Sequence, residues 1–271
     1  MRVRKKKWAK DAIAKIEQCL TGEAACAYKG KWRSRFDSEQ MAKLAKSELV
    51  PTDLNATPLY LEIGCGKGKF VSELALKNPK SQIVAMDSEI NALCFAAKKV
   101  EAANLPVSLI FGTAENLKDL FSEQEVDRIY LNFSTPWPKT AHHKRRLTYP
   151  TFLADYQEIL KTGGEIIVKT DNDEFFQASQ AYLKYMGFQL KLVKGNLQID
   201  EDVTGIMTEY EARFREQGLP IYQLVAIKLP LAEQLKEQAK WQAANSPLRA
   251  NTDWQYDFDY YAKLCERKKH L

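Results

Sequence analysis

Residues 59–68 read Leu59-Tyr-Leu-Glu-Ile-Gly-Cys-Gly-Lys-Gly68, and they give the clearest indication of the fold. Its mostly apolar first half predicts a buried strand, its glycines predict a tight turn, and the residues from Lys69 to Lys77 predict a helix. A glycine-rich turn between a strand and a helix lets the backbone approach a ligand beside the helix N-terminus. The sequence therefore predicts a cofactor loop at the start of an α/β domain.

Strands and helices are expected to alternate along the rest of the chain. We expect seven strands, at 59–63, 82–86, 107–111, 128–133, 165–169, 189–193 and 222–229. Helices are expected at 69–77, 89–103, 114–121, 149–160 and 174–185. Such alternation predicts a Rossmann-like α/β sheet, mostly parallel, with helices on both faces and binding loops at the carboxyl ends of the strands.

This pattern divides the chain into three parts. The α/β domain is expected at residues 58–229, after a basic amino-terminal segment and connector at 1–57. A C-terminal extension follows at 230–271. It starts as an amphipathic helix, breaks at Ser246-Pro247 and continues through an aromatic stretch, Trp254 to Tyr261. The sequence indicates no role for this extension.

The acidic residues around the glycine loop indicate which cofactor it binds. A dinucleotide-binding loop reads G-x-G-x-x-G, whereas this loop has the spacing G-x-G-x-G, at Gly64, Gly66 and Gly68. Glu62 would repel a pyrophosphate but attract the positively charged amino group at the amino acid end of S-adenosylmethionine (SAM). Asp87, at the end of the second strand, offers two oxygens to the ribose hydroxyls. We expect SAM, with NAD as the weaker alternative.

Positive charge is concentrated on two segments of the chain. Residues 1–33 hold ten Lys/Arg against three Asp/Glu, a net charge of +7, and residues 139–146 add four Lys/Arg and no acid. The whole chain carries only +5, so the remainder is acidic. Two basic segments on an acidic background are typical of a protein that binds a polyanion such as a nucleic acid.

Composition argues against several other classes of protein. The five cysteines include no C-x-x-C pair, which disfavours a disulfide framework and a metal site. Mean hydropathy is −0.42, and no apolar run approaches the roughly 20 residues that a membrane span requires. The basic start, Met1 to Trp8, lacks the apolar stretch of a signal peptide. We therefore expect a cytoplasmic protein that binds no metal ion and no membrane.

A second informative stretch, Leu131-Asn-Phe-Ser-Thr-Pro-Trp-Pro-Lys139, is followed by His142-His-Lys-Arg-Arg-Leu147. It resembles the bacterial tRNA (guanine-N7-)-methyltransferase family, whose signature reads N-F-S-D-P-W-P-K with a basic H-x-K-R-R-L beyond it. Further stretches have counterparts in the same order: Met1 to Trp8, Tyr28-Lys-Gly-Lys-Trp32, Lys169-Thr-Asp-Asn172, Met207-Thr-Glu-Tyr-Glu211 and Gly218-Leu-Pro-Ile-Tyr222. The match covers residues 1–33 and 59–229, and the tail from 230 has no evident counterpart.

The resemblance implies a class I SAM-dependent methyltransferase with a seven-stranded sheet. It implies methyl transfer to N7 of a tRNA guanine, the one in the variable loop (position 46). It also implies a SAM site that includes Glu62, Asp87, Thr113 and Thr135. Contacts with guanine or tRNA are implied at Lys139, Asp171, Thr208 and Glu211.

Two positions depart from the family pattern. Thr113 stands where the family usually has Asp or Asn, although Glu115 is near enough in sequence to replace the contact. Thr135 replaces the signature Asp in the loop where the methyl group should meet its acceptor. Two alternatives to an active tRNA methyltransferase therefore stay open. The first is a weakly catalytic or non-catalytic relative that binds tRNA. The second is a small-molecule methyltransferase, which the basic segments disfavour.

Guanine N7 has an in-plane lone pair and no proton, so methylation needs in-line placement rather than a general base. A carboxylate would stabilise the positive charge that moves onto the ring, and it would select guanine by accepting from N1–H and N2–H₂. We expect Asp171 and Glu211 to serve these purposes, with Thr135 and Asp171 as the catalytic pair. Asp171 has a structural alternative, because Asp often caps the start of a helix.

The loop after the fourth strand is expected to contact the RNA. Trp137 lies between two prolines and is expected to stack on the extruded base. His142 and His143 are expected to be polar loop residues. The cations expected to hold the phosphate backbone are Lys139, Lys144, Arg145 and Arg146.

Overall fold

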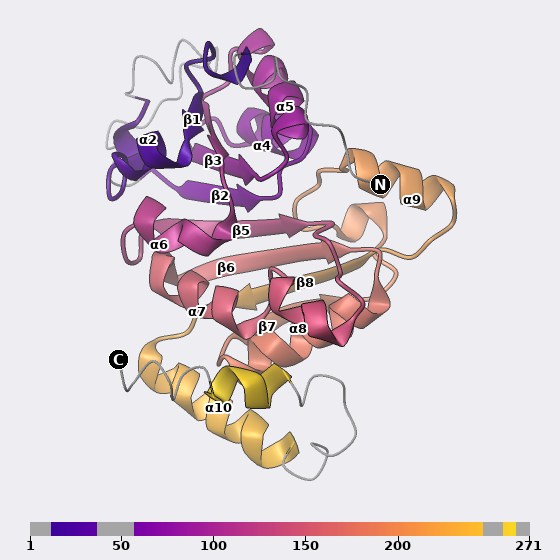
Figure 1. Ribbon diagram of the computed structural model, residues 1–271. Coiled ribbons are helices and arrows are strands. Elements are labelled where there is room, and N and C mark those ends of the chain that lie inside the picture. Colours follow the sequence, from indigo (N-terminus) through magenta and orange to yellow (C-terminus); the bar gives the residue numbers. More distant parts are fainter. Residues whose placement is uncertain (1–11, 37–56, 246–256, 264–271) are drawn as a thin grey trace.

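The computed structural model describes residues 12–36, 57–245 and 257–263, which form an eight-stranded sheet with helices on both faces (Figure 1). The strand order is β1-β4-β3-β2-β5-β6-β8-β7. The first six strands in that order are parallel, and β8 runs antiparallel to β6 and β7. The strands are β1 (Cys19–Thr21), β2 (Leu59–Ile63), β3 (Gln82–Asp87), β4 (Val107–Phe111), β5 (Val126–Asn132), β6 (Leu160–Thr170), β7 (Gln189–Lys194) and β8 (Tyr222–Ile227).

The expected seven strands correspond to β2 through β8, and β1 is an eighth. Residues Cys19 to Thr21 pair with Leu109 to Phe111 of β4, so the sheet extends into the part expected to be a segment and connector. Strand β6 begins at Leu160, which pairs with Val126. The Gly163-Gly164 pair therefore lies within this strand, which starts earlier than the expected strand at 165–169.

The helices fill the expected intervals, with two additions. They are α2 (Gly22–Cys26), α4 (Lys69–Lys77), α5 (Ile90–Ala102), α6 (Leu117–Leu120), α7 (Pro150–Ile159), α8 (Asp173–Tyr185), α9 (Glu209–Glu216) and α10 (Leu231–Asn245). Sequence patterning did not predict α2 or α9. Thr208 caps the start of α9, because its hydroxyl accepts a hydrogen bond from the Glu211 N–H at 3.0 Å.

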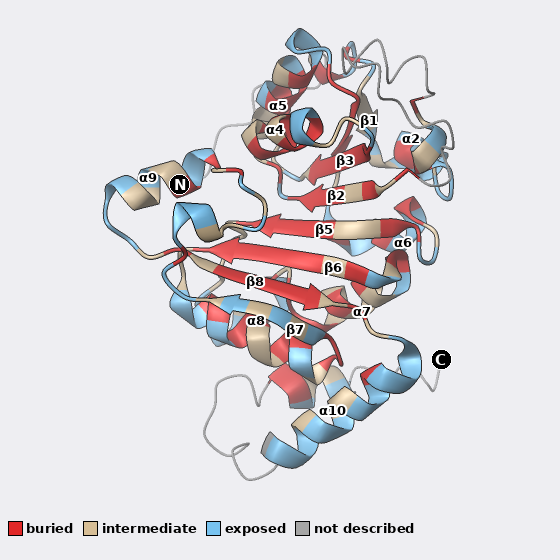
Figure 2. Ribbon diagram, turned by 180° about the vertical axis from the view of Figure 1, so that it is seen from behind, coloured by how far each residue is buried: buried red, intermediate tan, exposed pale blue. Residues whose placement is uncertain are grey.

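Two apolar cores lie on opposite faces of the sheet, because side chains alternate along a strand. In β3, Val84 and Met86 belong to one core, whereas Ile83 and Ala85 belong to the other. Helices α6, α7 and α8 cover the first core, and α4 and α5 cover the second. Figure 2 shows the central strands buried along most of their length. Both faces are thus closed, which leaves the strand ends for binding.

The C-terminal extension packs beside α8. Helix α10 follows β8, and residues 257–263 form a further short helix next to it (Figure 1). The Phe258 ring stacks on Tyr185 with a centroid distance of 4.2 Å and lies edge-on to Trp241 at 5.1 Å. In the described part of the chain, no helix is long and apolar enough to cross a membrane.

Candidate active site

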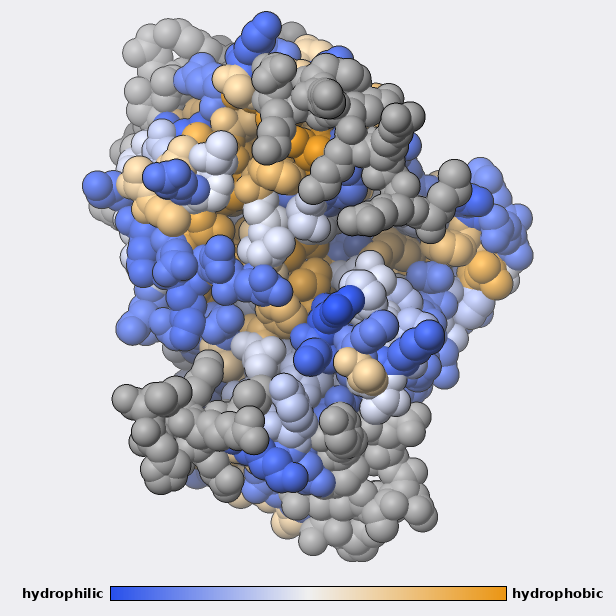
Figure 3. All heavy atoms as spheres, in the orientation of Figure 1, coloured by the Kyte–Doolittle hydropathy of each residue, from blue (hydrophilic) through white to orange (hydrophobic). Residues whose placement is uncertain are grey.

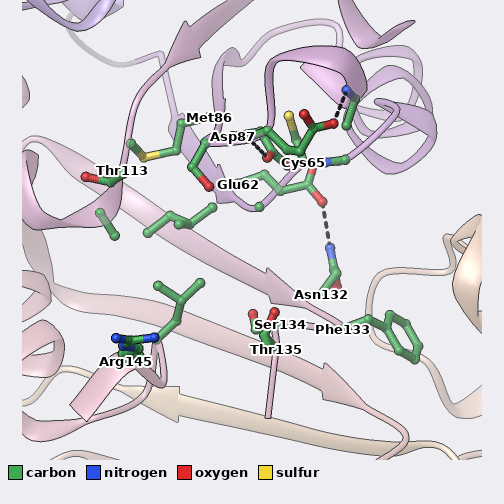
Figure 4. Close-up of a pocket in the computed structure, with 18 of the residues that line it drawn as sticks. Glu62, Cys65, Met86, Asp87, Thr113, Asn132, Phe133, Ser134, Thr135 and Arg145 are labelled. Atoms are coloured by element: carbon green, nitrogen blue, oxygen red, sulfur yellow. Dashed lines mark hydrogen bonds between the residues drawn. The ribbon is translucent and has the colours of Figure 1, made fainter. Parts of the chain in front are cut away.

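A pocket opens at the carboxyl ends of β2, β3, β4 and β5. The strand order reverses there, because β3 and β4 lie on one side of β2 while β5 and β6 lie on the other. Open α/β sheets bind ligands at such a switch point. Figure 3 shows apolar residues in the hollow of this face, with hydrophilic residues on the surrounding surface. Figure 4 shows the lining residues, with Glu62 and Asp87 on one side and Thr135 and Arg145 across from them.

Three glycines shape the loop after β2. The φ angles of Gly64, Gly66 and Gly68 are 85°, 55° and 78°, in the left-handed region that glycine adopts readily. A Cβ at Gly68 would lie 2.7 Å from the Ala96 Cβ on α5, so this position also lacks room for a side chain. A Cβ at Gly64 or Gly66 would meet nothing within 4 Å. The backbone at these two positions is therefore accessible to a ligand, as the sequence predicts.

Glu62 lines the pocket although it is only 2% exposed. Its Oε1 accepts a hydrogen bond from Asn132 Nδ2 at 3.0 Å, and its Oε2 has no hydrogen-bond partner among the described residues. Burial raises the pKa of this carboxyl group to about 7. A buried oxygen of this kind requires a donor. The ammonium group of SAM supplies one, so the residues present fit the amino acid end of that cofactor.

Asp87 joins the glycine loop to the end of β3. Its Oδ2 accepts from the Gly66 N–H at 2.8 Å, and its Oδ1 accepts from the Glu89 N–H at 2.7 Å. Burial raises the pKa of Asp87. Each carboxylate oxygen can accept more than one hydrogen bond, so the predicted contact with ribose hydroxyls would use the remaining lone pairs. Asp87 also fixes the loop that carries the glycines.

The loop after β5 forms the facing wall of the pocket. Thr135 is exposed there, and Thr113 is exposed after β4. Trp137 also lines the pocket, with a φ of 44°, which is unfavourable for a bulky side chain. The Arg145 guanidinium lies 5.0 Å from the Trp137 ring centroid, and the His142 ring lies edge-on at 5.8 Å. The basic segment at residues 139–146 therefore packs directly on the loop that contains Trp137.

An aromatic group that the sequence reasoning missed lies beside this wall. Phe133 stacks on Tyr210 and Phe214 of α9, with centroid distances of 6.5 and 6.2 Å. Tyr210 is 62% exposed and lines the pocket. The sequence signal for Tyr210 was its place in the Thr208-Glu-Tyr-Glu211 motif. Because sequence patterning did not predict α9, it could not place this motif beside Phe133.

The basic segment is divided between exposed and buried cations. Lys144 and Arg145 are exposed and line the pocket, and Lys139 is exposed outside the lining. Arg146 is 1% exposed and donates to the carbonyls of Pro136 and Trp137 at 2.7 and 3.2 Å. The expected phosphate contact of Arg146 is therefore wrong. A guanidinium enclosed by backbone carbonyls is not accessible to RNA; it holds the loop that contains Trp137.

His143 also differs from its expected role as a polar loop residue. It is 1% exposed, and its Nδ1 lies 3.0 Å from Asp257 of the C-terminal extension. Its partner lies 114 positions away in sequence, so local sequence context contains no sign of the contact.

Glu211 and Thr208 lie in different surroundings despite their shared motif. Thr208 lines the pocket, while Glu211 is 1% exposed and outside the lining. The Glu211 carboxylate accepts from the buried Lys169 ammonium and the Arg215 guanidinium, each at 2.8 Å. The structure does not bring Glu211 to the predicted guanine contact. It pairs instead with Lys169 on β6, which fixes α9 beside the pocket.

Asp171 follows β6 and is half-buried outside the pocket lining. Its alternative role as a helix cap is wrong, because Asn172 caps α8 by accepting from the Phe175 N–H at 2.7 Å. Its contact with guanine stays a prediction. Within the described ranges, no group of three or more His, Cys, Asp or Glu residues is placed to hold a metal ion.

The sheet topology, together with the pocket side formed by the glycine loop, Glu62 and Asp87, defines a class I SAM-dependent methyltransferase. A family model described as a putative methyltransferase matches residues 56–224. The solved structure of the 16S rRNA methyltransferase KamB has the same fold, with a TM-score of 0.50 at 16% identity, over 72% of this chain and 95% of that one.

Curated relatives identify the family more narrowly. The chain is 38% identical over 233 residues to the tRNA (guanine-N(7)-)-methyltransferase of Lactococcus lactis subsp. cremoris, covering 85% of this chain and 99% of the relative. It is 41% identical over 229 residues to the enzyme of that name from Lacticaseibacillus casei, covering 83% and 98%. The chain belongs to the tRNA (guanine-N7-)-methyltransferase family.

Proposed function

We propose that this chain transfers the methyl group of SAM to N7 of a guanine in tRNA, and that the guanine is the one in the variable loop. One observation carries the proposal beyond family membership. The Glu62 side of the pocket, which fits SAM, and the exposed cations Lys144 and Arg145 belong to the same pocket. Residues suited to bind the cofactor and residues suited to bind phosphates therefore line one pocket, which supports the proposal.

The residues of the chain perform binding and orientation in this reaction. SAM supplies an electrophilic methyl group, and guanine N7 attacks it without losing a proton. Glu62 accepts the cofactor ammonium, Trp137 offers a flat face for the extruded base, and Lys144 and Arg145 contact phosphates. In-line placement can supply several kcal/mol of the barrier reduction. Thr135 lies where the family signature has a carboxylate, so electrostatic help at N7 is weaker there.

A methyl-transfer assay on unmodified tRNA transcripts tests the proposal. Methyl-labelled SAM should label a transcript with guanine in the variable loop, but not the same transcript with adenine at that position. Binding of SAM and tRNA without any labelling would favour the non-catalytic alternative that Thr113 and Thr135 raise. Equal labelling of both transcripts would contradict the variable-loop assignment alone.

A further inference from the structure

The C-terminal extension reaches the basic segment that borders the pocket. Asp257, at the start of the short helix 257–263, is 1% exposed and contacts the equally buried His143 of η4 (Thr140–Arg145). Tyr260, one turn further along this helix, lines the pocket. The extension therefore contacts both the basic segment and the pocket wall.

Asp257 connects three other elements at one point. Its Oδ2 lies 3.0 Å from His143 Nδ1 and accepts a hydrogen bond from the Tyr182 hydroxyl of α8 at 2.5 Å. Its backbone carbonyl accepts from the Tyr149 hydroxyl, at the start of α7, at 3.1 Å. Burial and the bond to Asp257 raise the pKa of Tyr182, which keeps the phenol a donor. Together, these contacts hold His143 in one orientation.

The contacts continue from His143 to the loop after β5. His143 Nε2 lies 3.7 Å from Glu174 Oε1, and Arg146 donates to the same oxygen at 2.7 Å. Arg146 also holds the carbonyls of Pro136 and Trp137. A chain of polar contacts thus connects the extension to the loop that lines the pocket.

Apolar packing also attaches the extension to α8. Phe258 already stacks on Tyr185 and contacts Tyr182. Burying a carboxylate costs free energy unless hydrogen bonds compensate, so Asp257 is an inefficient way to add stability. Asp257 instead adds a directional contact with His143, which sits between the exposed residues of η4.

We propose that Asp257 is a positioning residue for RNA binding, which acts through His143 to hold Lys144 and Arg145 at the rim of the pocket. This inference rests on the proposed function, because the ligand is the phosphate backbone of tRNA. Cations held in place lose less conformational entropy when they bind. The extension is then part of the tRNA site, although the family model ends at residue 224.

The Asp257→Asn variant of the full chain tests the inference by binding at several salt concentrations. The Kd for an unmodified tRNA transcript should rise. The slope of log affinity against log salt should become shallower by about 2 if both cations lose their phosphate contacts. The Kd for SAM should stay at the wild-type value, because Glu62 and Asp87 are untouched. Asp259→Asn, an exposed position on the same short helix, is the matched control and should change neither quantity.

The salt slope separates positioning from mere stability. A purely structural role would lower the melting temperature and the active fraction but leave the slope unchanged, and that result would overturn the inference. If Asp257→Asn does not fold, Tyr182→Phe removes one bond to Asp257 and keeps the aromatic ring; its slope should change in the same direction by less, and a wild-type slope would overturn the inference. A wild-type protein that binds tRNA but transfers no methyl group would contradict the proposed function. The salt slopes of the wild type and the Asp257→Asn variant could still be compared, because they measure binding only.

Discussion

Glu62 combines a buried carboxyl group with an oxygen that has no hydrogen-bond partner among the described residues. Burial raises its pKa from the ordinary 4.5 to about 7, so the unfolded chain loses this proton at a lower pH than the folded protein does. Ionisation therefore destabilises the fold as the pH rises from about 4.5 to about 7, and the full cost is present above that range. The same negative charge attracts the ammonium group of SAM.

The Glu62→Gln variant should separate these two effects. Without SAM, we expect it to be more stable than the wild type by about 1–3 kcal/mol at pH 8, with the difference disappearing near pH 4. Its affinity for SAM should fall by about 10-fold or more, because a charge-assisted hydrogen bond is lost. Urea unfolding at both pH values and calorimetric titration with SAM measure the two effects. Unchanged stability together with unchanged SAM affinity would exclude this role for Glu62.

Thr135 is neutral where a carboxylate would stabilise the cation that forms on guanine. Loss of one preorganised electrostatic group typically costs about 10²–10³ in rate. We expect Thr135→Asp to raise the single-turnover methylation rate by about 10-fold or more, with little change in tRNA affinity, because phosphate contacts dominate binding. Thr135→Asn is a control of similar size without the charge. A slower Thr135→Asp enzyme would show that the site has adapted to threonine, and Glu115, which also lines the pocket, would be the next carboxylate to test.

At the scale of elements, the contact between α4 and α5 depends on Gly68. Alanine there would place its Cβ 2.7 Å from the Ala96 Cβ with φ at 78°, whereas alanine at Gly64 has a φ of 85° but open space. We expect Gly64→Ala to cost roughly 1–2 kcal/mol from backbone strain alone. Gly68→Ala should cost more, because overpacking adds roughly 1–3 kcal/mol. Denaturant unfolding compares the two, and equal losses would show that α4 and α5 separate freely.

The elements that sequence patterning predicted best are those with strong local signals. Strands β2 and β4 and helix α4 have the predicted boundaries, because apolar runs and glycines mark their ends. Strand β1 has three residues, too few for a visible alternation. In α9 the buried residue is the charged Glu211, so hydrophobic periodicity cannot reveal this helix.

The candidate site was predictable where its residues lie at or just after the carboxyl ends of strands. Glu62, Asp87, Thr113 and Thr135 all line the pocket, because parallel strands bring their carboxyl ends together. The predicted phosphate contact of Arg146 failed because a motif shows which residues are charged but not which of them are buried. Its partner Glu174 is 28 positions away, and only the folded chain brings the two together.

At the scale of the whole molecule, the basic residues set the expected salt dependence of tRNA binding. Residues 1–10 hold six Lys/Arg, but residues 1–11 lie outside the described part of the chain, so their contact with RNA stays a prediction. Deletion of residues 1–7 should weaken tRNA binding and flatten its dependence on salt, since each phosphate contact contributes about 0.9 to the slope. Filter binding over a salt series measures this. A slope equal to that of the intact protein would assign the basic start no part in RNA binding.

The proposed function requires one pocket to bring SAM and a tRNA guanine together for methyl transfer to N7. The most direct test is a single-turnover reaction of the intact protein with methyl-labelled SAM and an unmodified tRNA transcript, followed by digestion and mass spectrometry of the nucleosides. We predict that the label appears in N7-methylguanosine. Label in another nucleoside, or none while SAM and tRNA both bind, would contradict it.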